Sequence, residues 1–220
     1  MDGQRSADLL VTVVSRRRAL KTLAVFAVGG IAALRARPIN VALAAPALTL
    51  DPEARKYGYS VTATFAGYQA NEQITLKWNS DRSKPKNLVT TTADGSGNAV
   101  ATFRVPSDVR GWHELKGVGS MGSSAVAELR VIPRMRLSKT SGPRSTTLTV
   151  TVFGFNPYEY VEVRWDPGRR YTVTGTGTTS SLGSAKITVT IPSNARIGKR
   201  NIVVAGSDGS GDYTTFNVTG

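Results

Sequence analysis

The sequence T-V-T-V-F-G-F-N-P-Y-E-Y-V-E-V-R-W, at residues 149–165, decides the fold because the chain contains a second copy of it. The earlier copy, at residues 62–78, reads T-A-T-F-A-G-Y-Q-A-N-E-Q-I-T-L-K-W. Three matched pairs, each separated by 87 positions, define the repeat: Gly67 and Gly154, Glu72 and Glu159, and Trp78 and Trp165. A common offset across a glycine, an acid and a tryptophan indicates an internal duplication. The 220 residues are therefore predicted to form two similar domains.

Hydrophobic alternation predicts a strand on either side of the repeated glycine. Before Gly154, apolar residues at 148, 150 and 152 alternate with threonines at 149 and 151, which is the period of a half-buried strand. After it, Val161, Val163 and Trp165 occupy one face of a second strand. The first copy repeats both patterns with the inward residues Val61, Ala63, Phe65, Ile74, Leu76 and Trp78. The glycine is therefore predicted to form a corner between two strands.

The remainder of each copy adds further strands separated by turns. In the first copy we expect strands at about residues 47–50, 59–66, 74–78, 88–92, 99–105 and 112–117, and a last strand ending at 131, with counterparts in the second copy. The offset falls from 87 to 86 between Trp78 and Gly97, so one residue has been lost in that interval. Short strands at this spacing predict an all-β chain of two tandem immunoglobulin-like β-sandwiches, at residues 45–132 and 133–220.

The repeated pattern G-[FY]-x-x-x-E-x-[VI]-x-[VLI]-x-W, with a V-P-S or I-P-S strand end and a late G-S turn, also carries a resemblance. It resembles the tandem immunoglobulin-like repeats of bacterial secreted and surface proteins, including the transcription-factor-immunoglobulin (IPT/TIG) type, over residues 47–218. The first copy departs from the pattern at Ala70-Asn71, where the second has a proline-containing turn. The resemblance implies the fold, but such repeats serve as spacers, adhesive modules and appendages of enzymes.

Residues 1–44 have the features of an export signal helix. The segment S-R-R-R-A-L-K, at residues 15–21, resembles the twin-arginine pattern S-R-R-x-F-L-K, with Arg16 and Arg17 as the paired arginines. The apolar run at residues 22–34 is too short to span a membrane and suits a signal peptide, and Ala42-Leu43-Ala44 offers cleavage after Ala44. We expect a prokaryotic protein exported to the periplasm, cell surface or medium. The alternatives are an uncleaved signal that anchors the chain, or a helix of the folded domain.

The net charge of +13 is shared unevenly along the chain. The first 44 residues hold 7 Lys/Arg and 2 Asp/Glu, and the remainder holds 21 and 13. A basic protein is attracted to polyanions such as cell-wall polymers, lipid headgroups or nucleic acid, although a net charge can also serve solubility alone. No basic run interleaves aromatic residues in the way of a nucleic-acid groove. We therefore expect envelope proteins or anionic and other cell-wall polysaccharides as partners, no nucleic acid, and membrane contact only through the signal.

The composition argues against catalysis. There is no cysteine, which excludes disulfides and thiolate chemistry, and His113 is the single histidine and is expected on a strand at a sheet edge. Glu72 and Glu159 fall in different domains, so each is predicted to bond the preceding corner instead of forming a catalytic pair. Oxygen-rich segments at 94–98 and 208–212 leave calcium as an alternative, but tight turns explain them as well. We expect no catalytic residue, cofactor or metal.

Aromatic residues provide the candidate contact site. Trp112 has no aromatic counterpart in the second copy, and Tyr158, Tyr160 and Tyr171 cluster in sequence with Arg169-Arg170. Exposed aromatic rings near basic residues could bind sugars or an acidic partner, although isolated surface aromatics are also common. We therefore predict a non-enzymatic secreted or cell-surface protein acting in protein binding, adhesion or spacing. The alternatives are a carbohydrate- or cell-wall-polymer-binding module and an accessory subunit of an exported enzyme complex.

Overall fold

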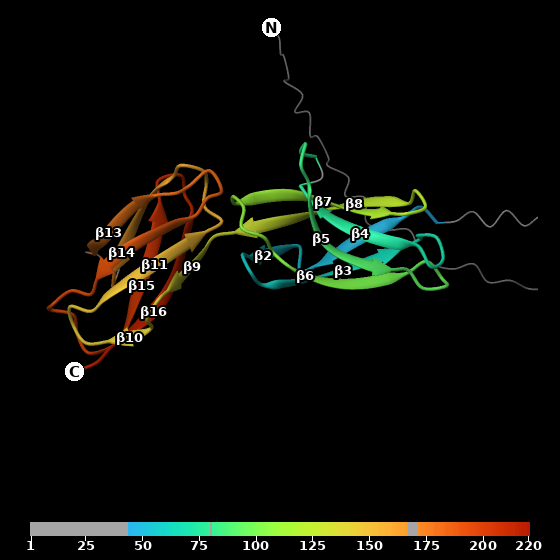
Figure 1. Cartoon of the computed structure of the whole chain (residues 1–220). Coiled ribbons are helices and arrows are strands. Elements are labelled where there is room, and N and C mark those ends of the chain that lie inside the picture. The colour runs from blue at the N-terminus through green and yellow to red at the C-terminus, as the bar shows by residue number, and fades with distance from the viewer. Residues whose placement is uncertain (1–43, 80, 167–170) are drawn as a thin grey trace, which may run out of the picture. The chain divides into compact units, whose positions relative to one another are not determined.

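A computed structural model describes residues 44–79, 81–166 and 171–220 (Figure 1). All the regular secondary structure in these ranges is β-strand, which confirms the all-β prediction. In this part of the chain there is accordingly no helix of the length and apolarity needed to cross a bilayer. The predicted signal, with Arg16 and Arg17, lies outside the described residues, and so do Arg169 and Arg170.

The first sandwich pairs a three-stranded sheet with a five-stranded sheet. The small sheet has the order β1-β3-β6, and the large sheet has the order β2-β8-β7-β4-β5. All pairings are antiparallel except that of β2 with β8. The strands are β1 (Ala47–Asp51), β2 (Ala54–Lys56), β3 (Ser60–Ala66), β4 (Gln73–Trp78), β5 (Lys86–Thr92), β6 (Ala99–Arg104), β7 (Gly111–Gly119) and β8 (Ser124–Ile132).

The second sandwich repeats this topology strand for strand. Its small sheet has the order β14-β11-β9, and its large sheet has the order β10-β16-β15-β12-β13. The short strand β10 pairs in parallel with β16, as β2 does with β8. The strands are β9 (Arg134–Leu137), β10 (Ser141–Gly142), β11 (Thr147–Phe153), β12 (Tyr160–Trp165), β13 (Thr172–Thr178), β14 (Ala185–Thr190), β15 (Gly198–Gly206) and β16 (Gly211–Val218).

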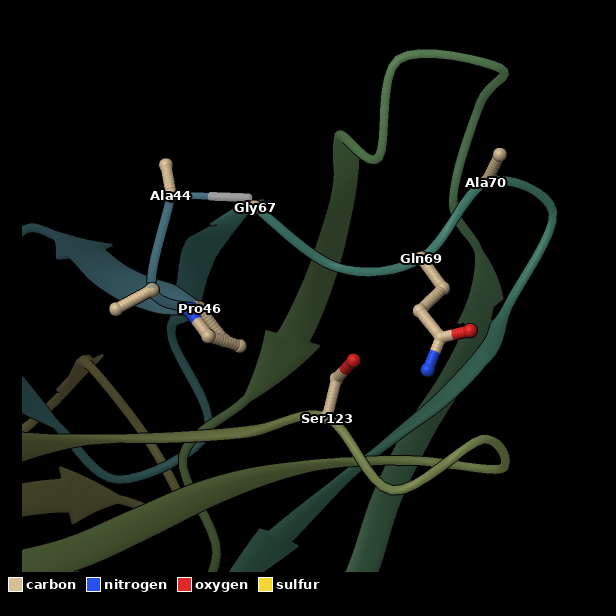
Figure 2. A pocket seen from close by; sticks show the side chains of 7 residues that line it. Ala44, Pro46, Gly67, Gln69, Ala70 and Ser123 are labelled. Carbon is tan, nitrogen blue, oxygen red and sulfur yellow. The ribbon is translucent and has the colours of Figure 1, made fainter. Parts of the chain in front are cut away.

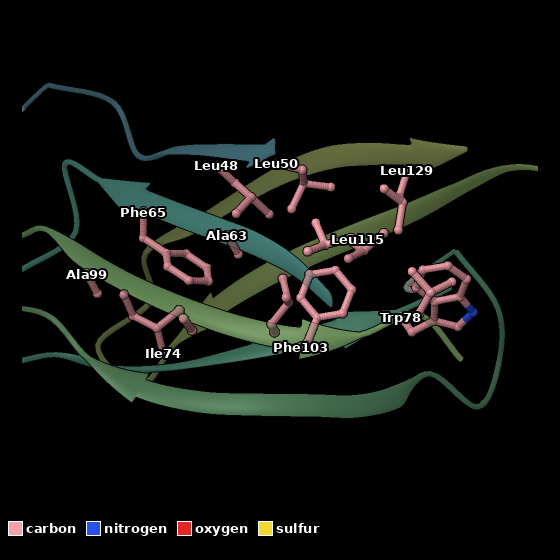
Figure 3. Close-up of a cluster of buried hydrophobic side chains, with 14 of the residues drawn as sticks. Leu48, Leu50, Ala63, Phe65, Ile74, Trp78, Ala99, Phe103, Leu115 and Leu129 are labelled. Atoms are coloured by element: carbon pink, nitrogen blue, oxygen red, sulfur yellow. The ribbon is translucent and has the colours of Figure 1, made fainter. Parts of the chain in front are cut away.

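Each sandwich has its own apolar core. In the first, buried side chains from both sheets meet between the layers, with Phe65 and Phe103 on the small sheet and Ile74, Trp78 and Leu115 on the large one (Figure 3). A second cluster extends from Met135 to Val218. All the inward positions predicted on either side of the repeated glycine are buried. The residues that alternate with them are therefore free to differ, and they form the outer faces on which ligand contacts must be sought.

The corner glycines adopt the conformation that the repeat predicts. Gly67 and Gly154 have φ angles of 71° and 66°, a region that favours glycine.

The strand positions also locate the residue that the second copy has lost. The strand β12 starts 87 residues after β4, whereas β13 starts 86 residues after β5. The loss therefore corresponds to the interval between Trp78 and Lys86, which is narrower than the predicted interval. The strand β8 ends at Ile132 and β9 begins at Arg134, while the domain limits at 45–132 and 133–220 stay predictions.

Candidate functional site

The repeated glutamate is buried and binds two separate turns in each sandwich. Glu159 is 1% exposed, and its Oε2 accepts the Asn156 backbone N–H at 2.8 Å. Its Oε1 accepts the backbone N–H groups of Asp208 and Ser210 at 2.9 and 3.2 Å. The carboxylate thus joins the corner before β12 to the turn between β15 and β16. We call this arrangement the carboxylate clamp.

The first sandwich contains the same clamp around Glu72. Its Oε2 accepts the Gln69 N–H at 3.0 Å, and its Oε1 accepts those of Met121 and Ser123 at 2.7 and 3.3 Å. The predicted bond to the preceding corner is confirmed, but the bonds to the β7–β8 turn were not foreseen. A catalytic role is not supported, since each carboxylate is buried and occupied by backbone donors.

Hydrogen bonds keep both clamp carboxylates ionised. Burial opposes the charged form of Glu159, but the Ser210 hydroxyl and the N–H groups of Asn156, Ser210 and Asp208 outweigh it, so its pKa lies below the ordinary value. The pKa of Glu72 is lowered in the same way, against burial, by Ser123, Gln69 and Met121. The clamp is therefore a structural element of the scaffold that both copies share.

His113 is also structural, and its predicted position at a sheet edge is wrong. The strand β7 lies between β8 and β4, and His113 is 4% exposed because its ring stacks on Trp78 with centroids 4.7 Å apart. Its Nε2 donates to the Val109 carbonyl at 2.8 Å, and its Nδ1 lies 2.8 Å from Asn79 Oδ1. Both ring nitrogens are thus engaged inside the fold, where the histidine cannot reach a substrate.

Asp108 completes this buried polar network. Its Oδ2 accepts the Trp78 indole N–H at 2.9 Å and the Asn79 amide N–H at 2.6 Å. Burial opposes its ionisation, but these donors, the Val109 N–H and the nearby His113 outweigh burial and lower the pKa of Asp108. The offset of 86 that aligns Pro106-Ser107 with Pro192-Ser193 places Asn194, which is exposed, opposite Asp108 in the second sandwich. The network therefore stabilises only the first sandwich.

The two oxygen-rich loops use their carboxylates within the fold. Asp94 Oδ1 accepts the backbone N–H groups of Ser96 and Asn98 at 2.8 and 2.9 Å. Asp212 bonds Lys56 Nζ at 2.7 Å through Oδ1 and the Met135 N–H at 2.8 Å through Oδ2. Among the described residues, no group of three or more acidic or histidine side chains could hold a metal ion. Asp94 closes its own turn, and in the second loop the Gly209 N–H bonds the Gly206 carbonyl at 3.2 Å, so the turn interpretation accounts for both loops.

The structure brings two of the predicted aromatic residues onto one surface. Tyr160 lies on the outer face of β12 and is 47% exposed. Tyr171 lies just before β13, and the Arg164 guanidinium sits 4.5 Å above the centre of its ring. Arg164 is held there by Glu162, whose Oε2 accepts the Arg164 Nε–H at 3.0 Å. The arginine is thus fixed between a carboxylate and an aromatic ring.

A third tyrosine on this surface was not predicted. Tyr213, in β16, is 73% exposed and pairs with Val203, which in turn pairs with Arg164. The strand β13 adds Val173 beside Arg164. We call this surface the tyrosine face and define it by Tyr160, Arg164, Tyr171, Val173, Val203 and Tyr213. Tyr213 follows Tyr171 by 42 residues, so only the sheet order brings the two rings onto one face.

The other predicted aromatics lie elsewhere. Trp112, in β7 of the first sandwich, is 57% exposed and forms one wall of a groove of about 290 Å³ whose lining includes Glu53 and Glu128. Tyr158 is 71% exposed in the turn before β12, with a φ of 56°, and it is not a member of the tyrosine face. The sequence cluster is therefore divided among separate surfaces.

A larger open pocket, of about 510 Å³, lies beside the Gly67 corner of the first sandwich (Figure 2). Its walls are mostly small or neutral side chains, and they include Ala44, the predicted cleavage residue. A Cβ at Gly67 would lie 2.7 Å from the Ala44 carbonyl oxygen, so the segment before β1 packs closely on this corner. The pocket has no titratable side chain in its lining and supplies no catalytic group.

Comparison with known proteins identifies general likenesses. No protein-family model matches the chain, and no curated protein matches it. Similar solved structures include the Yersinia pseudotuberculosis adhesin InvE, at 13% identity over 80% of this chain and 59% of that one, with a TM-score of 0.35. A teleost fish polymeric immunoglobulin receptor ectodomain is similar at 19% identity, over 76% and 94% of the chains, with a TM-score of 0.32. A tetra-tandem repeat from the extending region of a large adhesion protein is similar at 16% identity, over 80% and 49%, with a TM-score of 0.34.

Proposed function

We propose that this chain is a non-enzymatic, exported adhesion-type protein that binds a protein partner through the tyrosine face of its second sandwich. The observation that carries the proposal is the set of three exposed tyrosines on one sheet. Tyrosine is enriched in protein interfaces because a rigid ring supplies apolar contact area and its hydroxyl supplies a hydrogen bond. Energetically dominant residues at such interfaces are most often Trp, Tyr and Arg.

Comparison of the two copies supports a binding role for this face. The positions of Tyr160, Arg164 and Tyr213 hold Gln73, Lys77 and Val126 in the first sandwich. Both copies contain the clamp and bury apolar residues at matching core positions, so the scaffold does not require tyrosines at these positions. The tyrosine face of the second sandwich therefore differs from the matching face of the first sandwich at positions that the fold does not constrain.

Export is part of this proposal and rests on the twin-arginine-like segment at residues 15–21, with cleavage after Ala44. Replacing Arg16 and Arg17 by lysine should leave the protein in the cytoplasm, as measured by cell fractionation. Undiminished export of this variant would show that another route carries the protein.

Binding can be measured by flow cytometry, with biotin-labelled protein added to washed cells of the producing organism. Tyr213→Ser and Tyr160→Ser together should weaken binding about 30-fold or more, because the loss of a single interface anchor of about 2 kcal/mol already corresponds to about 30-fold. Tyr158→Asn is the matched control, since it removes an equally exposed tyrosine outside the face, and asparagine tolerates the positive φ at this position. Mild trypsin treatment of the cells should remove the binding, whereas binding that survives it would contradict a protein partner.

A further inference from the structure

The small sheet of the second sandwich carries a row of two cations and a hydroxyl. Arg136 in β9 and Lys186 in β14 both pair with Thr151, which lies between them in β11. Paired residues on neighbouring strands point to the same side, so all three occupy the outer face. Alternate strands are about 10 Å apart, which sets the separation of the two cationic positions. We call these three residues the cationic row.

Both cations of the row are available to a ligand. Arg136 and Lys186 are exposed, and neither has a hydrogen-bond, ion-pair or ring partner among the described residues. The row lines an open groove of about 300 Å³ together with Leu137, Ser138 and Phe153. Within residues 133–220, the acidic residues all lie in or next to the strands of the large sheet: Glu159, Glu162, Asp166, Asp208 and Asp212. The small sheet has none, so its positive potential is not neutralised locally.

The first sandwich lacks this feature although its backbone is the same. The row equivalent to Arg136, Thr151 and Lys186 consists of Thr49, Thr64 and Val100, with the same register. Residues 45–132 hold 10 Lys/Arg and 8 Asp/Glu, whereas residues 133–220 hold 11 and 5. The fold therefore does not require cations at these positions, and the excess charge belongs mainly to the second sandwich.

We propose that the cationic row binds an acidic polysaccharide, whose charged groups contact Arg136 and Lys186. Charge complementarity selects a polyanion, and the threonines of β11 and β14 supply hydroxyls for sugar groups: Thr147, Thr149, Thr151, Thr188 and Thr190. Among the described residues, none of the exposed large apolar side chains lies on β9, β11 or β14. Phe153, which lines the groove, is only partly exposed, and its ring stacks on that of Tyr57. The face therefore lacks the fully exposed apolar residues that insert into a membrane and the free rings that stack on nucleic-acid bases. This site goes beyond the proposed protein contact, because it lies on the other sheet.

The test compares variants of the full protein on immobilised hyaluronate, a polysaccharide that bears carboxylates, with dextran as the neutral control. The row variant, Arg136→Thr with Lys186→Val, introduces the residues found at the equivalent positions of the first sandwich, so the fold should tolerate it. We expect about 25-fold weaker binding at about 0.05 M NaCl, roughly fivefold per cation, and little binding by any variant at about 0.5 M. The equal-charge control, Arg196→Thr with Lys199→Val, should change the affinity less than about threefold. The reciprocal change, Thr49→Arg with Val100→Lys, should strengthen binding.

Three results would overturn the proposal. The first is an equal loss of affinity in the row variant and the equal-charge control, which would mean attraction by net charge alone. The second is tighter binding of the wild type to single-stranded DNA or to phosphatidylglycerol vesicles than to hyaluronate. The third is binding to dextran that matches binding to hyaluronate. Tyr213→Ser should leave hyaluronate binding unchanged, so failure of the tyrosine face and failure of the cationic row are distinguishable.

Discussion

Glu159→Gln isolates the contribution of a buried carboxylate that both sandwiches share. The side chain keeps its shape, but one clamp oxygen becomes an NH₂ group. If that group replaces Oε2, it faces the Asn156 N–H, whose donor lies 2.8 Å away, and one buried donor loses its acceptor. The bonds from Asp208 and Ser210 remain but lose the charge that strengthens them.

The magnitude follows from these three bonds. An unsatisfied buried donor costs about 1–3 kcal/mol, and changing a charged acceptor to a neutral one costs about 1 kcal/mol for each remaining bond. Relief of the desolvation of the carboxylate offsets part of this loss. We expect the free energy of unfolding of the second sandwich to fall by about 2–4 kcal/mol, or its melting temperature to fall by roughly 10–20 °C.

The measurement is thermal unfolding of the full protein followed by far-ultraviolet circular dichroism. The control is Glu162→Gln in the same strand, which breaks a half-exposed pair with Arg164 and should cost no more than about 1 kcal/mol. A loss below about 0.5 kcal/mol in Glu159→Gln would refute the account of the clamp.

The pH dependence provides a second readout of the same prediction. Because the pKa of Glu159 is lower in the folded protein than in the unfolded chain, its stabilisation is complete above about pH 4.3 and is lost as the pH falls through the folded value. Glutamine does not titrate, so the difference in stability between wild type and Glu159→Gln should shrink in acid. A difference that stays constant down to pH values well below about 4 would contradict the lowered pKa.

The remaining predictions concern the supports of the two sandwiches. Gly206→Ala places a Cβ 2.1 Å from Glu159 Oε1 and should destabilise the protein by about 3 kcal/mol or more in urea unfolding, whereas Gly95→Ala, whose Cβ meets no atom within 4 Å, should change stability by less than about 0.5 kcal/mol. Equal effects of the two changes would contradict the close packing. Asp108→Ala leaves the Trp78 indole N–H without its acceptor and should cost the first sandwich about 2–4 kcal/mol by the same assay, and a neutral result would show that water replaces the carboxylate.

Local sequence patterns predicted the regular parts of the fold well. Period-two alternation identified β3 and β11, because every inward residue contributes to a core and most of the outward ones are serine or threonine. The short strands β2 and β10 were missed, since three and two residues carry no period and their structure comes from pairing with β8 and β16. His113 was misplaced because the position of β7 inside the sheet depends on its non-local partners, β4 and β8.

The candidate surfaces were less predictable for the same reason. Tyr160 and Tyr171 were found because they are close in sequence, whereas Tyr213 joins them only through the strand order β16-β15-β12-β13. The cationic row combines residues 50 positions apart on β9 and β14, which the central strand β11 brings into one line. What the duplication does predict is which residues belong to the scaffold. The tyrosines and the two cations of the row lie at positions where the copies differ.

Site-specific photo-crosslinking from the centre of the tyrosine face tests the proposed binding function most directly. A photoreactive amino acid would replace Val203, between Tyr213 and Arg164, and in a matched protein would replace Lys116, its counterpart on the first sandwich. After irradiation on washed cells of the producing organism, position 203 should give a discrete protein adduct, and position 116 should not. No adduct from position 203, or equal adducts from both positions, would contradict a binding site on the tyrosine face.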